Sequence, residues 1–423
     1  MQIIDVKSLL SKNKDQVENF LSLIIIQGLN TIIPLFLFPY LVRTLGQVQY
    51  GQAAFVISLI NFLQIIIDFG FNYTGTKMVA LAKTSEERSK IFYSIFFIKL
   101  LLFFVCVIIL ILTGILIAKV KAMFMFFVIS SGLLLGNVLF PVWFFQGMEK
   151  MKVMSAFNFF IRIASLVLIV IYVKSPYHTE RYVLINSLSN LIPGFFCFSY
   201  CIYLFKIEFK FPDLNQIKDI FNNGKDLFIS NLIIGGYSSI RIFVIGLFSN
   251  GQLLGIYSIL ERIYLIIQTF PLGSFLQATY PKLVKIIETD RNKVINFMKK
   301  AANYSLLYFS VAVIIFLIVQ PWLLNDVLKV KLPLNYVTLS VLFGITVVLV
   351  NYNTFRIEYL LISGNDKLFR VIHFYAGIIG TVTMLAFTYK WDVIGCAASV
   401  VLTQSTIILY TLYVYKKHLG FII

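Results

Sequence analysis

The sequence predicts an all-α polytopic membrane protein of about 12 transmembrane helices arranged as two six-helix bundles. Hydrophobic residues make up 59% of the 423 positions, charged residues make up 13%, and the mean hydropathy is +0.87. A water-soluble domain does not need so apolar a composition. Apolar runs of about 20 residues, the length that crosses about 30 Å of hydrocarbon, recur along the chain. We therefore expect a protein that is largely embedded in a membrane.

The apolar runs define the expected helices in order. They cover residues 17–42, 51–71, 92–118, 122–145, 154–173, 182–205, 225–248, 254–278, 302–324, 334–360, 370–389 and 392–415. The polar connection at 206–224 separates the sixth run from the seventh. The predicted domains are therefore an N-terminal bundle at 1–205, a cytoplasmic linker at 206–224 and a C-terminal bundle at 225–423.

A weak internal repeat supports the division into halves. Gly51 aligns with Gly255, and at the same offset Gln64 aligns with Gln268. A second match, at a slightly larger offset, places Gly147–Met151 on Gly364–Leu368. Both halves start on the same side of the membrane, so the repeat is parallel. Transporters built in this way commonly bind their substrate between the repeats, which predicts a central cavity.

The net charge of +17 is unevenly distributed, and this distribution indicates how the chain is oriented in the membrane. Connections on one side of the membrane, both termini among them, carry most of the Lys and Arg residues. The opposite side holds only Arg43, Lys119, Lys121, Lys174, Arg181, Lys329, Lys331 and Lys390. By the positive-inside rule the richer side, with the N- and C-termini, is cytoplasmic. No nucleic-acid-binding motif accompanies the charge.

Four basic residues inside the apolar runs are the candidate binding residues: Lys99, Arg162, Arg241 and Arg262. A charge at the bilayer centre costs about 2.5–3.5 kcal/mol on insertion scales, so each needs a reason. Cations without matching acids suggest a water-filled cavity with an anionic occupant. Guanidinium suits phosphate in particular, because its planar fork donates two parallel hydrogen bonds. We expect Lys99 and Arg162 to lie nearer the cytoplasm. We expect Arg241 and Arg262 to lie nearer the outside.

Structural explanations compete for several of these charges. Glu261 could neutralise Arg241 or Arg262 in a salt bridge, but not both. Arg356 and Glu358, close to the cytoplasmic end of their helix, could snorkel to the interface. Asp68 precedes Gly70 and is expected to be an interfacial cap rather than a proton carrier. Among the acids, Glu261, Asp68 and Glu358 are the candidates for ion coupling or gating.

Catalysis is not expected. The sequence contains no HExxH, GxSxG, P-loop or GxGxxG motif and only three histidines. The four cysteines lie in apolar runs without a CxxC pair, which predicts small core residues rather than metal ligands. We therefore expect no metal and no cofactor.

Several segments resemble a known family. The segment Pro39–Gly46 with Tyr50 and Gly51, followed by Asp68–Phe71, resembles the N-terminal signature of bacterial polysaccharide-export flippases. These are the Wzx-type O-antigen flippases of the multidrug/oligosaccharidyl-lipid/polysaccharide exporter superfamily. PVWFFQGMEK, residues 141–150, resembles the family's Trp-Phe-Phe-Gln-Gly-x-Glu-Lys segment. Second-half counterparts follow at 255–262 and 273–283, in the family's order.

The resemblance implies both a fold and a function. It implies a MATE-like, V-shaped pair of bundles in the bacterial inner (cytoplasmic) membrane. The implied activity moves undecaprenyl-pyrophosphate-linked oligosaccharide repeat units, O-antigen or a similar surface polysaccharide, from the cytoplasmic to the periplasmic leaflet by alternating access. An H+ or Na+ gradient would drive transport, and an O-antigen polymerase and a chain-length regulator are expected partners. The alternatives are a cation-coupled drug antiporter, another lipid-linked precursor flippase of the superfamily, or a scaffold for the polymerisation machinery.

The signature residues are expected to serve as joints. Trp143 and its neighbouring phenylalanines suit an aromatic anchor at the cytoplasmic interface, and Gly147 suits the end of the fourth helix. Gln146 belongs to the same segment. With Pro39, Gly46 and Gly51, these residues form the predicted hinge set.

Overall fold

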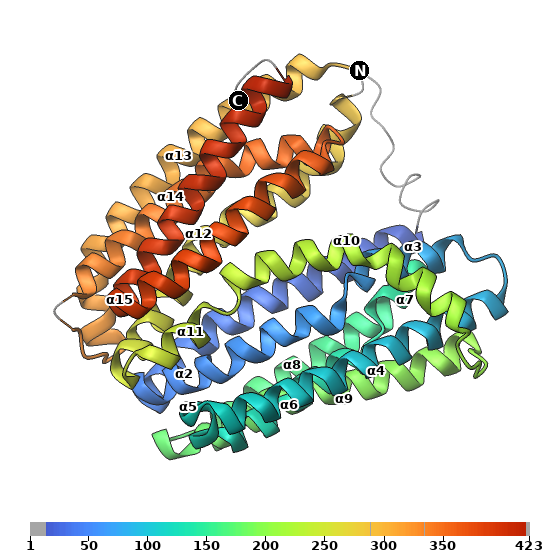
Figure 1. Ribbon diagram of the computed structural model, residues 1–423, viewed down its shortest axis with the longest axis horizontal. Coiled ribbons are helices and arrows are strands. Elements are labelled where there is room, and N and C mark those ends of the chain that lie inside the picture. Colours follow the sequence, from blue (N-terminus) through green and yellow to red (C-terminus); the bar gives the residue numbers. More distant parts are fainter. Residues whose placement is uncertain (1–13, 288, 334, 420–423) are drawn as a thin grey trace. The chain divides into compact units, whose positions relative to one another are not determined.

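The computed structural model describes residues 14–287, 289–333 and 335–419, and within these ranges the chain is helical (Figure 1). Eight of the described helices are long and apolar enough to cross a membrane. The number becomes nine if α10 (Leu214–Ser238) and α11 (Arg241–Phe248), bent by 42°, form one span. The predicted all-helical, polytopic class is thus confirmed for the described residues.

Two of the helices are each longer than one membrane crossing. The first, α2 (Lys14–Asp68), consists of two helices separated by a break at Gly46. The φ of this residue is 78°, a backbone conformation that glycine adopts more readily than other residues. The chain of α2 stays helical through Pro39 and breaks seven residues later, where the sequence predicts a turn between crossings. The second, α15 (Asp366–Val414), is interrupted in the same way at Asp392.

The helices form two compact units. Unit 1 comprises the described chain up to Tyr40 and Ile60–Leu232, and unit 2 comprises Leu41–Leu59 and the described chain from Ile233 onward. Part of α2 therefore belongs to unit 2, although most of that unit comes from the second half of the chain. Most of α10, as far as Leu232, belongs to unit 1, where Ile220 is fully buried. The predicted boundaries at 205 and 225 remain a prediction.

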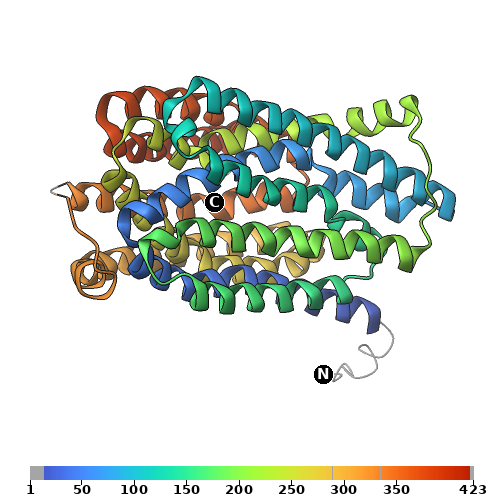
Figure 2. The same ribbon diagram turned by 90° about the horizontal axis from the view of Figure 1, so that it is seen from below.

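Unit 1 is built from helices of the first half and from α10 as far as Leu232. Its elements after α2 are α3 (Phe71–Leu81), α4 (Ser85–Leu116), α5 (Ala118–Ala122), α6 (Phe124–Leu139), α7 (Val142–Gly147), α8 (Lys152–Tyr172), a 3₁₀ turn at Pro176–His178 and α9 (Thr179–Phe205). Figure 2 shows the long helices of this unit running side by side. In the core, α6 packs on α9 and α3 packs on α7.

The fourth predicted helix, 122–145, is not continuous. It breaks between α6 and α7 at Phe140, which is extended, and Pro141, which precedes α7. The physical reason is that proline disfavours helical backbone in the residue before it. The six-residue helix α7 is then held on α3, because a Cβ on Gly147 would lie 2.8 Å from Val79 and one on Gly75 would lie 3.0 Å from Trp143.

The predicted interfacial role of Trp143 is wrong. Trp143 is 2% exposed, and the phenylalanines that follow it are fully buried in the core of unit 1. Its indole lies within 6.0 Å of the ring of Phe92, centroid to centroid. Gln146 accepts a hydrogen bond from Thr76 Oγ1 at 3.3 Å. The segment is therefore part of the internal packing of the unit.

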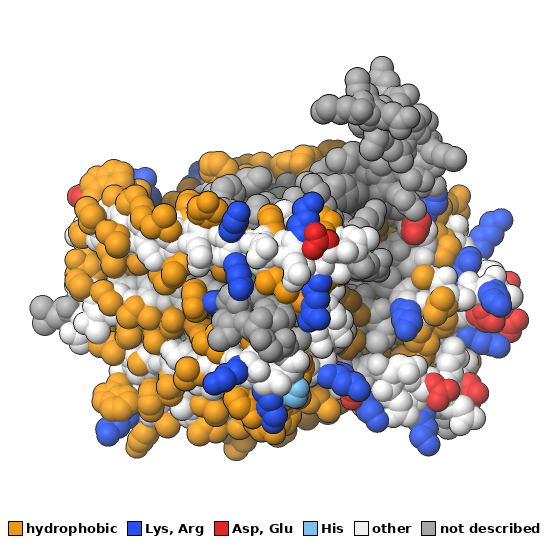
Figure 3. Space-filling model, turned by 90° about the horizontal axis from the view of Figure 1, so that it is seen from above, with side chains coloured by type: hydrophobic (Ala, Val, Ile, Leu, Met, Phe, Trp, Pro, Cys, Tyr) orange, Lys and Arg blue, Asp and Glu red, His pale blue; other side chains and the backbone are white. Residues whose placement is uncertain are grey.

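Unit 2 contains α11, α12 (Gly251–Ile287), α13 (Arg291–Trp322), a π-helical turn at Leu323–Val327, α14 (Tyr336–Ile362), α15 and a second π-helical turn at Tyr415–Leu419. Within it, α14 packs against α13, α12 and α15. Figure 3 shows one face of the molecule, on which hydrophobic side chains cover large areas while Lys, Arg, Asp and Glu side chains gather in the middle and at one end.

The two glycines aligned by the internal repeat meet inside unit 2. A Cβ on Gly51 would lie 2.8 Å from Gly255 Cα, and a Cβ on Gly255 would lie 2.2 Å from the carbonyl oxygen of Gln47. Gln47 Nε2 also donates to the carbonyl oxygen of Gln252 at 2.8 Å. The repeat seen in the sequence thus marks a site where backbone meets backbone and no side chain can be inserted.

Candidate functional site

A polar cavity lies inside unit 1. Its volume is about 270 Å³, and its lining comes from α2, α3, α4, α6, α7, α8, α9 and the bend before α7. The lining residues are Gln64, Asp68, Asn72, Lys99, Gly136, Asn137, Phe140, Val142, Asn158, Arg162, Asn190 and Pro193. The cavity contains two of the four predicted binding residues, Lys99 and Arg162, together with Asp68.

Lys99 is anchored deep in this unit. It lies near the middle of α4, and its side chain is 3% exposed. Its ammonium donates to the carbonyl oxygen of Asn137 at 2.8 Å and forms an ion pair with Asp68 Oδ1 at 3.4 Å. The side chain of Asp68 is 30% exposed. Asp68 is therefore the partner of Lys99 at the end of α2, and its role as an interfacial cap remains a prediction.

Arg162 is the second cation of the cavity. It stands halfway along the 21-residue helix α8, about 15 Å from either end by the rise per residue. Asn158 lies one turn earlier on the same face and also lines the cavity. Within the described residues, no ion pair to Arg162 is present. With Lys99 and Asp68, the cavity therefore holds two cations and one anion.

Two helices approach closely enough to shape the cavity wall. A Cβ on Gly136 of α6 would lie 2.7 Å from the backbone of Asn190, and one on Gly194 of α9 would lie 2.6 Å from the carbonyl oxygen of Gly136. This approach brings Asn137 and Asn190 to the same cavity. α9 remains helical through Pro193.

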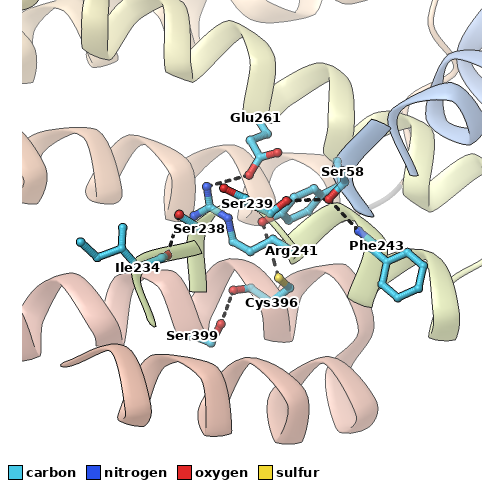
Figure 4. Close-up of polar contacts among 10 residues, drawn as sticks. Ser58, Ile234, Ser238, Ser239, Arg241, Phe243, Glu261, Cys396 and Ser399 are labelled. Carbon is cyan, nitrogen blue, oxygen red and sulfur yellow. Dashed lines mark hydrogen bonds and ion pairs between the residues drawn. The ribbon is translucent and has the colours of Figure 1, made fainter. Parts of the chain in front are cut away.

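Arg241 and Glu261 form a separate site in unit 2. Arg241 begins α11, and its guanidinium forms an ion pair with Glu261 Oε1 at 2.9 Å (Figure 4). The two side chains are 20% and 16% exposed. The proposed salt-bridge alternative is therefore the observed arrangement for Arg241. Ser58 stabilises the junction between α10 and α11. It donates a hydrogen bond to the carbonyl oxygen of Ser239 at 2.6 Å and accepts one from the Phe243 amide at 3.3 Å.

The remaining predicted charges lie elsewhere in unit 2. Arg262 follows Glu261 and is half-buried, as is Glu358 on α14. Arg356 does not snorkel: it is 4% exposed and covers the ring of Tyr352, with its guanidinium carbon 4.0 Å from the ring centroid. Burial among the helices of its own unit replaces the predicted exposure at the interface.

The sequence argument missed the amide groups of the cavity. Asn and Gln carry no charge and interrupt an apolar run only mildly, so a search for intramembrane charge passes over them. Their helical spacing gives one usable signal, since Asn158 and Arg162 are four residues apart. The pairing of Lys99 with Asp68, 31 residues away, has no local signature.

The family follows from a comparison with known proteins. Residues 16–287, more than half of the chain, match the family described as "Polysaccharide biosynthesis protein". The chain belongs to this family. The described helices and their apolar surfaces fit that assignment, and the resemblance predicted from the signature segments is confirmed.

Two relatives match the chain beyond residue 287. A protein of Escherichia coli (strain K12) named "Putative O-antigen transporter" is 25% identical over 391 residues, which cover 91% of this chain and 93% of that protein. A protein of Shigella dysenteriae with the same name is 24% identical over 411 residues, which cover 94% of this chain and 100% of that protein.

Two solved structures share the fold of this family member. One is described as "Lipid II flippase MurJ, inward closed conformation", with a TM-score of 0.70, 13% identity, and coverage of 95% of this chain and 87% of that chain. The other is an inward-facing multidrug resistance MATE family transporter of the MOP superfamily, with a TM-score of 0.64, 14% identity, and coverage of 90% and 97%. At these identities the likeness establishes the fold.

Proposed function

We propose that the protein is a flippase for undecaprenyl-pyrophosphate-linked oligosaccharide repeat units of an O-antigen or a similar surface polysaccharide. It moves them from the cytoplasmic to the periplasmic leaflet of the bacterial inner membrane by alternating access. The family match and the names of both relatives support a transporter rather than an enzyme. Twelve crossings in two bundles of six, with domains at 1–205 and 225–423 and both termini in the cytoplasm, complete the proposed architecture.

The observation that carries the proposal is the cation surplus of the unit 1 cavity. Lys99 and Arg162 lie at mid-helix positions among apolar spans and share one carboxylate, Asp68. An anionic group entering the cavity would restore neutrality. In this poorly solvated site charge-assisted hydrogen bonds are strong, so the ammonium and the guanidinium can replace the water lost by a pyrophosphate.

The apolar and polar parts of the substrate are expected to occupy different environments. The polyprenyl tail remains in lipid, where the exposed apolar side chains of α4 and α8, such as Leu101, Phe104 and Phe160, leave it undisturbed. The sugar and the pyrophosphate leave water for the polar interior of the protein. A change in the access of the site from one leaflet to the other then completes the transfer.

The charged residues of unit 2 have a separate role in the proposed transport cycle. We propose that Arg241 and Arg262 form the later anion sites, and that Glu261 holds Arg241 until a proton or a sodium ion binds the carboxylate. Glu358 and Asp68 are further candidates for coupling or gating. The hinge set of Pro39, Gly46, Gly51, Trp143, Gln146 and Gly147 joins helices that move together, with α7 moving as one body with α3.

Replacement of Arg162 tests the function. In a strain whose own flippase gene is deleted, Arg162→Ala should abolish surface polysaccharide while the membrane abundance of the protein is unchanged. The matched control is Arg181→Ala, which removes an exposed arginine at the start of α9 and should complement fully. Full complementation by Arg162→Ala would refute the anion site. Dye efflux that depends on Arg162, without any polysaccharide defect, would favour the drug antiporter.

A further inference from the structure

We infer that the Tyr40 hydroxyl is a positioning group for transport: it ties the C-terminal end of α8 to α2 and thereby fixes where α8 holds Arg162. Tyr40 lies outside the lining of the cavity, so it acts through α8 and not on the substrate. The inference rests on the proposed function, because it takes Arg162 as the group that meets the pyrophosphate.

The contact between Tyr40 and the end of α8 is the first observation. The Tyr40 hydroxyl donates to the carbonyl oxygen of Val173 at 2.7 Å and lies 3.0 Å from that of Val170. Val173 ends α8 and is fully buried. The last four carbonyl groups of a helix have no partner within the helix, and the Lys174 amide is not available because it donates to His178 Nδ1. The hydroxyl therefore satisfies backbone groups that α8 itself leaves open.

The sparse packing of α8 is the second observation. Its packing partner among the helices is α9, and much of its surface is exposed. The buried residues of this 21-residue helix are Met154, Ser155, Asn158 and Ile169, and three of these four lie in its first two turns. The half of α8 that follows Arg162 therefore has little packing of its own. A hydrogen bond at its end has a large share in holding it in place.

The place of Tyr40 on α2 is the third observation. Unit 1 includes α2 as far as Tyr40, and Leu41–Leu59 belong to unit 2. Pro39 removes one backbone donor from α2 at this joint. A rotation of α2 here moves the Tyr40 hydroxyl and, through it, the end of α8. Arg162 lies 11 residues before Val173, about 16 Å along the helix, and moves with it.

A second contact at the same end of α8 is weaker. Arg181 Nη1 donates to the carbonyl oxygen of Tyr172 at 3.4 Å, in an exposed position. Water can replace this long contact at little cost. The tie made by Tyr40 is shorter and partly buried, so we assign the positioning of α8 to Tyr40.

A double-mutant cycle tests the inference. Binding of radiolabelled farnesyl pyrophosphate to the purified full-length protein in lipid nanodiscs is measured for the wild type, Tyr40→Phe, Arg162→Met and the double variant. Tyr40→Phe removes only the hydroxyl and should weaken binding about tenfold, the value of one hydrogen bond. Arg162→Met should weaken binding at least as much. In the Arg162→Met background Tyr40→Phe should change nothing, because its effect passes through the arginine.

The result is informative because the two positions lie far apart. Effects of distant, independent positions add, so a loss of the Tyr40 effect in the absence of Arg162 shows that α8 connects them. Incorporation of 4-aminophenylalanine at position 40 returns a hydrogen-bond donor to the ring. It should restore the affinity of the wild type, which a role in packing alone does not predict.

The matched control is Tyr172→Phe, which removes an exposed hydroxyl from the last residue of α8 and should leave the affinity unchanged. A lower unfolding temperature of Tyr40→Phe with wild-type affinity would overturn the inference, as would the same loss of affinity with and without Arg162. Either result leaves the flippase proposal intact. No binding by the wild type, or no effect of Arg162→Met, would overturn both.

Discussion

At the scale of single residues, the ion pairs Lys99–Asp68 and Arg241–Glu261 differ in what surrounds the charges. Arg241 and Glu261 form an ion pair of one cation and one anion, whereas the unit 1 cavity retains a cation beyond its ion pair. A buried pair is weak evidence of net stabilisation, but removal of one partner leaves a charge in a poorly solvated place. The two sites therefore respond differently to charge removal.

We expect Arg241→Ala to reduce the stability of the folded protein. The change leaves Glu261 without its ion-pair partner, which should cost about 3 kcal/mol. Thermal unfolding of the purified protein in detergent measures the loss. Adding Glu261→Gln to this variant should recover most of it. If Arg241→Ala unfolds at the wild-type temperature but transport is lost, the arginine acts on the substrate rather than on Glu261.

At the scale of elements, glycine contacts fix the helix crossings. Gly51 meets Gly255 in unit 2, and Gly136 meets the α9 backbone in unit 1. In both places a missing side chain allows two backbones to touch, as in small-residue packing between membrane helices. The close crossing of α6 and α9 in unit 1 also places Asn137 and Asn190 in the lining of the cavity.

Gly255→Ala should disrupt the crossing of α2 and α12. Its Cβ would meet the carbonyl oxygen of Gln47 at 2.2 Å, so the backbones must separate at a cost of about 1–3 kcal/mol. Gly236→Ala is the matched control, since its Cβ would meet only Thr381 Oγ1, at 3.3 Å. Unfolding temperature and the amount of protein in the membrane measure both effects. Similar values for the two variants would contradict the tight crossing.

Much of the helix pattern could be predicted from hydropathy, because each crossing needs an apolar run of fixed length. The break at Gly46 lies between two predicted runs, and the mid-helix positions of Lys99 and Arg162 already singled them out. The break at Pro141 was missed because the apolar run continues through it. The burial of Trp143 was missed because an interfacial aromatic and a core aromatic look alike in sequence. The amide lining was missed because its members come from five different helices.

At the scale of the whole molecule, the uneven charge predicts the orientation of the chain. We expect a fluorescent protein fused after Ile423 to be fluorescent, because a cytoplasmic C-terminus lets it fold. Alkaline phosphatase fused after Ser175, in the connection that follows α8, should be active because that connection is expected to lie in the periplasm. The reverse pattern in both fusions would refute the positive-inside assignment. A fusion after Lys150 is the control and should resemble the C-terminal one.

The division of α2 between the units has a practical consequence. Leu41–Leu59 lies in the unit that is completed by the second half of the chain, while Ile60–Asp68 carries Gln64 and Asp68 to the cavity of the other. In a fragment ending at residue 205, the helix surface around Gly51 would lack its packing partner, Gly255 of α12. The gene therefore cannot be cut at the seam into self-sufficient modules. Co-expressed fragments should protect each other from proteolysis, and each should be degraded when made alone.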